Sequence, residues 1–260
     1  MKPLIQLCSA LILLTFNQQL SYAETEVTVA QSVYSNSTVS LTYVSPPRLV
    51  QVIKDSLSNA QLSSEQSNPL PIYWLGAGLY DASTEAALLT QRQQILNTLK
   101  TQYSDMGKPD HIQALKTLAT WIANNQFLQR QFIPLDYDVI RLKEELNPLL
   151  QGKYLLTLPS KPQDVLVLGA VTQNGPQPFV VRQNASQYIE NAIPLKASEN
   201  SFAWLIQPDG KIEKYPIAYW NQQHIDIAPG AIIYLDFDGV RDNEPALNQH
   251  ILELLKHWVR

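Results

Sequence analysis

Alternating apolar and polar positions predict two strands near the beginning of the chain, over residues 26–34 and 38–44, which are rich in Val, Thr and Tyr. Apolar residues at helical spacing then predict an amphipathic helix over residues 48–58. A short apolar run at residues 72–75 predicts a third strand, which Gly76 ends. The first part of the chain therefore has a hairpin, then a helix, then a strand.

The pattern changes to a helical period over residues 81–125, where a break at Gly107 and Pro109 separates two apolar stripes. Two helices joined by a short turn form an αα-hairpin. Strand-like sequence resumes at residues 154–158, after the second helix. We therefore expect the helical hairpin to be inserted into the fold that the first strands begin.

A second block with a similar order of elements begins near residue 164. A helix is predicted at residues 185–191, and strands are predicted at residues 165–168, 178–181, 202–206, 211–215 and 231–235. A hairpin, a helix and further strands are the order expected of a β-grasp unit. The fold class that follows is α+β, with two β-grasp-like domains.

The clearest amphipathic pattern lies at the C-terminus, over residues 242–260. Asn243 is placed to cap this helix, and Pro245 lies in its first turn. The apolar face consists of Leu247, Ile251, Leu254, Leu255 and Trp258. This face could pack on the chain's own domain, pair with the helix of a partner, or rest on a membrane surface. We favour packing on the chain itself, and the same five residues are the candidates for contact with a partner helix.

Residues 1–23 have the pattern of a cleavable signal peptide, with a positive start, an apolar run over residues 4–16 and small residues at Ser21 and Ala23. The run is too short to span a bilayer, which takes about 20 apolar residues. Cys8, the single cysteine, lies inside the run without the preceding small residues of a lipoprotein site. We expect an exported protein that has neither a lipid anchor nor disulfides.

Charge and hydropathy exclude two classes of partner. The formal net charge is −4 and the chain has no basic run, so nucleic acid is not an expected partner. After the signal peptide, no stretch is apolar for long enough to cross a membrane as a helix. We expect a monomer without stable membrane insertion, large enough to bury a core without disulfides.

Five short segments follow one another at a characteristic spacing. They are residues 73–77 (YWLGA), 130–136 (RQFIPLD), 167–171 (VLGAV), 218–221 (AYWN) and 228–231 (APGA). In this order, and together with the terminal helix, they resemble the GfcC-like family of capsule or exopolysaccharide biosynthesis proteins of Gram-negative bacteria. The resemblance covers nearly all of the chain after residue 23.

The resemblance implies a periplasmic protein with two β-grasp domains, similar to the SLBB-like domains of outer-membrane polysaccharide export channels. We expect the first domain over residues 24–160, with the helical hairpin inserted at about 81–125, the second over 161–241, and the amphipathic helix over 242–260. The implied partners are a polysaccharide or proteins of polysaccharide export and assembly. The family brings no catalytic residues and no cofactor, and we expect neither.

Arg130 is a candidate for ligand binding, because proteins that the chain resembles have a suspected functional arginine directly after the helical hairpin. A guanidinium offers a planar fork of donors to carboxylates and phosphates, which acidic sugars carry. The alternative is a structural arginine that pairs with a carboxylate such as Asp136 or Asp138.

Aromatic residues supply further ligand-binding candidates, because an aromatic face suits the apolar face of a pyranose. Tyr73, Trp74 and Trp220 are candidates of this kind, with Asn221 beside the last and Tyr219 before it. The alternative is packing in the core, since these residues lie in or beside predicted strands.

Asp236 and Asp238 follow an apolar strand and precede a glycine, which resembles the nucleophile loop of haloacid-dehalogenase-type phosphatases. In such a loop one aspartate attacks phosphorus and the second acts as acid and base. Too few residues follow to supply the remaining catalytic groups, so a strand that ends in a polar loop is the favoured interpretation.

His250, Glu253 and His257 lie along one side of the terminal helix. Metal binding needs ligands that converge on one ion, usually with a fourth group. We interpret them as solvated residues and expect no metal site.

Three functions remain open at this point. The first is a non-enzymatic periplasmic accessory protein of capsule or exopolysaccharide assembly or export, which binds glycan or a component of the export machinery. The second is an assembly module that recruits a partner through its C-terminal helix. The third is a phosphohydrolase or glycan-acting enzyme that uses Asp236 and Asp238.

Overall fold

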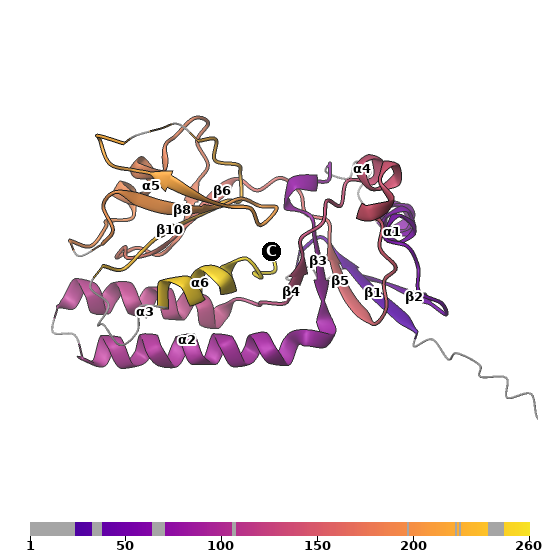
Figure 1. The fold of residues 1–260 in the computed structure, drawn as a ribbon, viewed down its shortest axis with the longest axis horizontal. Helices are drawn as coiled ribbons and strands as arrows, with labels where there is room; N and C mark the ends of the chain where they lie inside the picture. The colour runs from indigo at the N-terminus through magenta and orange to yellow at the C-terminus, as the bar shows by residue number, and fades with distance from the viewer. Residues whose placement is uncertain are drawn as a thin grey trace, which may run out of the picture.

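The computed structural model describes residues 24–32, 38–63, 71–105, 108–196, 198–221, 223, 225–238 and 247–260. This part of the chain has a mixed α+β structure with two five-stranded sheets (Figure 1). The predicted signal peptide, the turn at residues 35–37, and the capping positions Asn243 and Pro245 lie outside the described residues.

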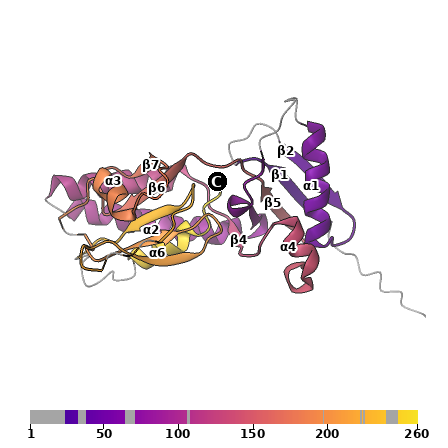
Figure 2. The same cartoon turned by 90° about the horizontal axis from the view of Figure 1, so that it is seen from above.

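The first sheet has the strand order β2-β1-β5-β3-β4. Its strands are β1 (Thr25–Ala30), β2 (Thr38–Tyr43), β3 (Gly78–Asp81), β4 (Gln129–Gln131) and β5 (Lys153–Thr157). β1 and β5 are parallel, and the other pairs are antiparallel. Side chains that alternate along β1, such as Val27 and Val29, pack against α1 (Leu49–Ser63). The short helix α4 (Tyr137–Leu142) lies beside α1 (Figures 1 and 2) and begins at Asp136, whose carboxylate accepts hydrogen bonds from two backbone N–H groups.

The second sheet repeats the strand order of the first, as β7-β6-β10-β8-β9. Its strands are β6 (Asp164–Gly169), β7 (Gly175–Pro178), β8 (Phe202–Ile206), β9 (Ile212–Pro216) and β10 (Ile232–Leu235). The first and last of them, β6 and β10, are again the parallel pair. The helix α5 (Ala185–Asn191) follows the first hairpin, as α1 does in the first sheet. The two sheets are therefore built on one topological plan.

Two long helices, α2 (Glu85–Asp105) and α3 (Pro109–Asn124), lie in sequence between β3 and β4 of the first sheet. They pack against each other, and their buried side chains belong to the hydrophobic core of the second sheet. Figure 1 shows them running beneath that sheet, on the face opposite α5. A segment that starts and ends in the first sheet thus completes the core of the second.

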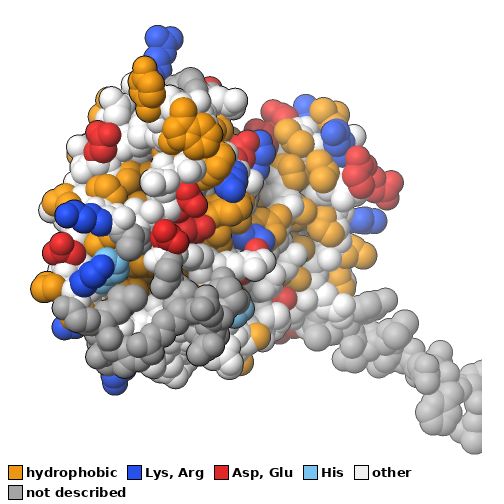
Figure 3. Space-filling model, turned by 60° about the vertical axis from the view of Figure 1, so that its left-hand side comes forward, with side chains coloured by type: hydrophobic (Ala, Val, Ile, Leu, Met, Phe, Trp, Pro, Cys, Tyr) orange, Lys and Arg blue, Asp and Glu red, His pale blue; other side chains and the backbone are white. Residues whose placement is uncertain are grey.

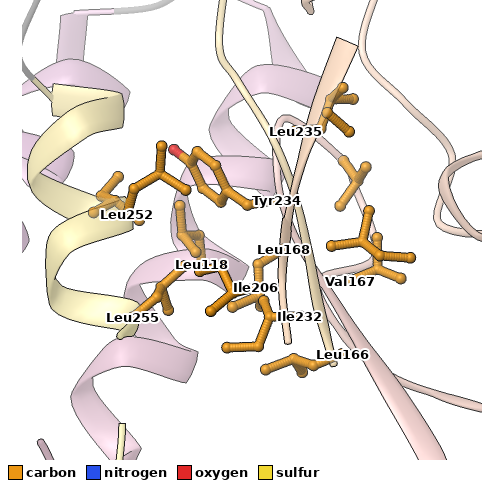
Figure 4. Packing of buried hydrophobic residues seen from close by; sticks show 14 of the residues in the cluster. Leu118, Leu166, Val167, Leu168, Ile206, Ile232, Tyr234, Leu235, Leu252 and Leu255 are labelled. Carbon is orange, nitrogen blue, oxygen red and sulfur yellow. The ribbon is translucent and has the colours of Figure 1, made fainter. Parts of the chain in front are cut away.

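The C-terminal helix α6 (Leu247–Leu255) lies beside α3 on the same face of the second sheet and packs against α2. Figure 4 shows Leu252 and Leu255 of α6 facing Tyr234 and Leu118, with side chains of the sheet behind them. Asn248 fixes the helix to the end of β10, because its Oδ1 accepts hydrogen bonds from the Tyr234 hydroxyl at 2.9 Å and the Phe237 N–H at 3.1 Å. Its Nδ2 donates to the Phe237 carbonyl at 3.0 Å.

After α6, the last residues run beside residues 126–128, which lead into β4. The Leu128 N–H donates to the His257 carbonyl at 3.0 Å, and the Val259 N–H donates to the Gln126 carbonyl at 2.9 Å. The hydroxyl of Tyr80 on β3 donates to the Trp258 carbonyl at 3.2 Å. We call residues 256–260 the C-terminal strap, because they tie α6 to the first sheet.

Two strand predictions need correction. Residues 74–76 form a 3-10 turn, in which the Gly76 and Ala77 N–H groups donate to the Tyr73 and Trp74 carbonyls, and β3 begins only at Gly78. The predicted strand at 178–181 is also misplaced, because β7 ends at Pro178. β7 lies at the edge of its sheet, where a proline without an N–H is tolerated.

Candidate functional site

A cleft of about 400 Å³ lies where the two sheets meet. The cleft is lined by residues after β1, the linker between β5 and β6, the start of β6, α3 and the C-terminal strap. Its polar and aromatic lining residues are Gln31, Ser32, Ser160, Asp164, Trp121, Trp258 and Arg260. We call it the junction cleft, since pockets between structural units are common places for ligands.

Two tryptophans form the aromatic wall of the junction cleft. The rings of Trp121 on α3 and Trp258 in the C-terminal strap meet edge to face, with their centroids 5.3 Å apart. The Trp258 indole N–H donates to Asn125 Oδ1 at 3.0 Å, which fixes the orientation of this ring. The wall is therefore held in place from both the helical hairpin and the C-terminal end.

Arg260 places a cation against this wall. Its guanidinium carbon lies 4.8 Å from the centroid of the Trp258 ring, and Nη1 donates to the Gly230 carbonyl. The pKa of Arg260 is lowered to about 10, mainly by burial and also by Arg130, against the opposing effects of Tyr80, Tyr73 and Asp164. The half-buried side chain therefore still carries its positive charge near neutral pH.

Arg130 is buried, with 6% of its surface exposed, and lies between the two sheets. Nη1 donates to the Pro208 carbonyl at 2.7 Å, in the turn between β8 and β9, and Nη2 donates to the Ala77 carbonyl at 2.9 Å, beside β3. Neither carboxylate that the sequence offered is its partner: Asp136 caps α4, and Asp138 pairs with Arg141 at 3.1 Å. Arg130 joins the sheets through backbone carbonyls, and its role toward a ligand stays a prediction.

Tyr73 and Trp74 also lie near the junction but do not line the cleft. The Tyr73 hydroxyl donates to the Pro229 carbonyl at 3.2 Å, so its ring spans from the first sheet to the second. Burial raises the pKa of this hydroxyl. Trp74 is half-buried against the core of the first sheet. Both geometries fit the packing alternative, and their role as ligand contacts is untested.

Trp220 and Asn221 lie in a different place, on the turn after β9. Tyr219 and Trp220 are 98% and 74% exposed. Asn221 Nδ2 donates to the Ser201 carbonyl at 2.9 Å, next to β8. The five ligand-binding candidates from the sequence therefore do not form one site, because Arg130, Tyr73 and Trp74 lie near the sheet junction and this pair lies on the second sheet.

The five candidates for a partner helix belong to the chain's own core. Leu247, Ile251, Leu254 and Leu255 are at most 2% exposed, and Trp258 is half-buried beside them. The favoured expectation, packing of this face on the chain itself, agrees with the structure. A partner would have to displace α6 from the second sheet to reach these four side chains.

Asp236 and Asp238 have different surroundings at the end of β10. Asp236 Oδ2 accepts a hydrogen bond from the Trp204 indole N–H at 3.0 Å, and burial raises the pKa of this carboxyl. Asp238 is exposed. Among the described residues, no group of three or more His, Cys, Asp or Glu side chains is placed to bind a metal ion.

His257 has a structural contact that the sequence did not indicate. Its Nδ1 accepts a hydrogen bond from the Arg130 N–H at 3.1 Å, so the ring must be neutral at this nitrogen. Burial lowers the pKa of His257, and Lys256 and Arg130 act in the same direction, whereas Glu253 raises it.

The outer surface carries no single sign of charge on the face drawn in Figure 3, where basic and acidic side chains are interspersed with exposed hydrophobic ones. None of the helices in the described ranges is both long and apolar enough for a membrane span.

The junction cleft was not predicted, because its residues are far apart in the sequence. Arg260 belongs to the polar face of the predicted C-terminal helix, and Trp121 lies within the second of the two predicted long helices. The sequence offered one indication of this site: Trp258 and Arg260, two long side chains, lie close together at the end of the C-terminal amphipathic segment.

Comparison with known proteins identifies the family. The family model described as capsule biosynthesis GfcC, N-terminal, matches residues 23–160, and the model described as capsule biosynthesis GfcC C-terminal matches residues 173–259. A relative from Escherichia coli (strain K12), the uncharacterized protein YjbG, is 36% identical over 185 residues, which are 70% of this chain and 75% of the relative. The chain belongs to the GfcC family of capsule biosynthesis proteins.

Proposed function

We propose that this protein is a non-enzymatic accessory protein of capsule or exopolysaccharide assembly or export. The observation that carries the proposal is the match of both family models, which cover the first sheet, all strands of the second sheet except β6, and the terminal helix. It binds either a glycan or a component of the export machinery, and the junction cleft is the site of that contact.

The strand order supports assigning both units to the β-grasp fold, similar to SLBB domains. In each sheet the first and last strands are parallel neighbours at the centre, and a helix follows the first hairpin. On this assignment the first domain comprises residues 24–160, the second 161–241 and the terminal segment 242–260. The helices α2 and α3 are then an insertion at the β3–β4 connection, where the second sheet has only the short turn at residues 207–211.

The chemistry of the junction cleft favours an acidic glycan. Trp121 and Trp258 offer aromatic surface to the apolar face of a sugar ring. Arg260 offers a guanidinium that is only partly used by Gly230, and a carboxylate or phosphate substituent can accept from it. The hydroxyls of Ser32 and Ser160 supply donors and acceptors at the rim.

We further propose that the protein works in the periplasm, after removal of residues 1–23. The pattern of a positive start, an apolar run and small residues before Glu24 supports this location. Fractionation of cells should recover the protein with periplasmic markers, and N-terminal sequencing should begin at Glu24. Recovery of the chain with an intact Met1 in the cytoplasm would refute the location.

The function is tested in the host by deleting the gene and measuring the polysaccharide at the cell surface. We expect the polysaccharide to fall, and the wild-type gene to restore it. Ser160→Trp places a large side chain at the exposed rim of the cleft and should fail to restore it. Ser58→Trp, a matched change at an exposed serine on α1, should restore it fully. Unchanged polysaccharide in the deletion strain would refute the function, and rescue by Ser160→Trp would refute the cleft as its site.

A further inference from the structure

The most exposed aromatic side chains of the described chain lie on one rigid turn. Tyr219 and Trp220 are 98% and 74% exposed. The turn is closed by a hydrogen bond from the Asn221 N–H to the Ala218 carbonyl at 3.2 Å. It is tied to Ser201, whose carbonyl accepts from the Ile217 N–H at 3.0 Å and from Asn221 Nδ2 at 2.9 Å. Exposure of this kind on a fixed backbone indicates a contact surface, because a soluble domain normally covers large apolar side chains.

The strands next to this turn continue the aromatic surface. Phe202 and Trp204 alternate along β8, so they share one face of the sheet. The ammonium of Lys214 on β9 lies 4.2 Å from the centroid of the Phe202 ring and 5.8 Å from that of Trp204. This cation–π arrangement holds the two rings in fixed positions and leaves both half-buried.

Two buried oxygen atoms beside the aromatic residues have no hydrogen-bond donor within the described chain. They are Asn221 Oδ1 and Asp236 Oδ1. The segment before β8 connects them: the Glu199 N–H donates to the Asp236 carbonyl at 3.1 Å, and Ser201 contacts Asn221. A buried acceptor without a donor costs free energy, so such atoms point to a donor that a ligand supplies.

We propose that this surface, formed by Phe202, Lys214, Tyr219, Trp220, Asn221 and Asp236, binds neutral pyranose units of a glycan. We call it the aromatic-turn surface. Sugar hydroxyls are donors that suit the two free oxygens, and the C–H face of a pyranose stacks on an exposed aromatic ring. The carboxylates of Glu199 and Asp236 outnumber the cation Lys214, so charge complementarity disfavours uronates and phosphates here.

The inference deepens the proposed function by adding a second contact with the glycan. The junction cleft, with Arg260, suits an acidic group, whereas the aromatic-turn surface suits neutral sugars. A polysaccharide that contains acidic and neutral sugars could contact the junction cleft and the aromatic-turn surface at once. Two linked contacts bind more tightly than either contact alone.

The test uses the chain from Glu24 and neutral hexasaccharides: cellohexaose, maltohexaose and chitohexaose. Saturation-transfer NMR should detect binding of at least one, and titration should give a Kd. Trp220→Ala should weaken that Kd about tenfold, since one stacked ring is lost. Asp236→Asn, which replaces one acceptor oxygen by a donor, should weaken it by a similar factor. Leu142→Ala, at a side chain that is 77% exposed elsewhere, is the matched control and should change nothing.

Several outcomes would overturn the inference. They are the absence of binding to all three hexasaccharides, an unchanged Kd in Trp220→Ala, or tighter binding to polygalacturonate that depends on Trp220. Trp220-dependent binding to phosphatidylethanolamine–phosphatidylglycerol vesicles without hexasaccharide binding would assign the turn to a membrane surface instead. Ser160→Trp, which blocks the junction cleft, should leave hexasaccharide binding intact. Failure of the cleft and failure of the aromatic-turn surface are therefore distinguishable.

Discussion

Replacement of Arg130 by alanine should destabilise the fold, whatever the ligand is. The guanidinium donates to the carbonyls of Pro208 and Ala77 at 2.7 and 2.9 Å, and the side chain is 6% exposed. Arg130→Ala removes both donors and leaves two interior carbonyls to find new ones. Each unsatisfied group costs about 1–3 kcal/mol, so we expect a loss of about 3 kcal/mol or more in the free energy of unfolding.

The measurement is urea unfolding of the chain from Glu24 at pH 7.5, followed by tryptophan fluorescence. In thermal unfolding of a chain of this length, a loss of about 3 kcal/mol in the free energy of unfolding corresponds to a fall of roughly 6–12 °C in Tm. Arg130→Lys keeps the charge but not the planar fork, and should lie between the wild type and Arg130→Ala. Arg141→Ala is the matched control, because Arg141 is an exposed arginine in an ion pair with Asp138, worth about 0.5 kcal/mol or less.

A free energy of unfolding for Arg130→Ala within about 0.5 kcal/mol of the wild type would refute the structural role. The distinction affects how a functional defect is interpreted. The sequence left open a ligand contact, whose loss would leave the fold intact, and a structural role, whereas the buried geometry predicts that function and stability fall together. Loss of polysaccharide in an Arg130→Ala strain is evidence for ligand contact only if the purified variant is as stable as the wild type.

Three further predictions concern the core and the C-terminal strap. Leu254→Ala, at a fully buried position of α6, should cost about 2–5 kcal/mol by denaturant unfolding, and a value near that of a surface change would contradict the packing of this helix. Gly169→Ala should destabilise by about 2 kcal/mol or more, because Gly169 has φ of +106° and an added Cβ would lie 2.1 Å from the Leu235 carbonyl oxygen. The pKa of His257 is lowered in the fold, so its neutral form is favoured, and stability should fall as the pH drops below the unfolded value of about 6.5. His257→Gln should flatten this pH dependence of Tm and His250→Gln should not; an equal slope in all three proteins would contradict the assignment.

Local periodicity predicted five of the six α-helices of the described chain, because each of these five buries a stripe that neighbouring residues determine; the six-residue α4 was not predicted. The helix at residues 185–191 agrees with α5 to the residue, and both long helices lie inside the predicted segment 81–125. The strand predicted at 72–75 was wrong because an apolar run of four residues does not distinguish a strand from a 3-10 turn. β4, with three residues, is too short to show a pattern.

Long-range placement could not be predicted from the sequence for a different physical reason. Asp136 and Asp138 are close to Arg130 along the chain, yet Arg130 lies beside Ala77 and Pro208, which are 53 and 78 residues away. The spacing of hydrophobic residues along the chain does not indicate hydrogen-bond partners at such distances in the sequence. The same holds for the junction cleft, whose residues come from both sheets, the linker between them and the last residue of the chain.

The two proposed contact surfaces should respond differently when the joint between the sheets is weakened. The long helices leave the first sheet and complete the core of the second, while the C-terminal strap leaves the second and pairs with residues 126–128 beside the first. Because Trp258 and Arg260 of that strap form one wall of the junction cleft, the cleft exists only while the sheets are held together. The aromatic-turn surface consists of residues of the second sheet and its loops alone. A change that loosens the joint, such as Arg130→Ala, should therefore weaken binding in the cleft and leave hexasaccharide binding at the aromatic turn close to the wild-type value.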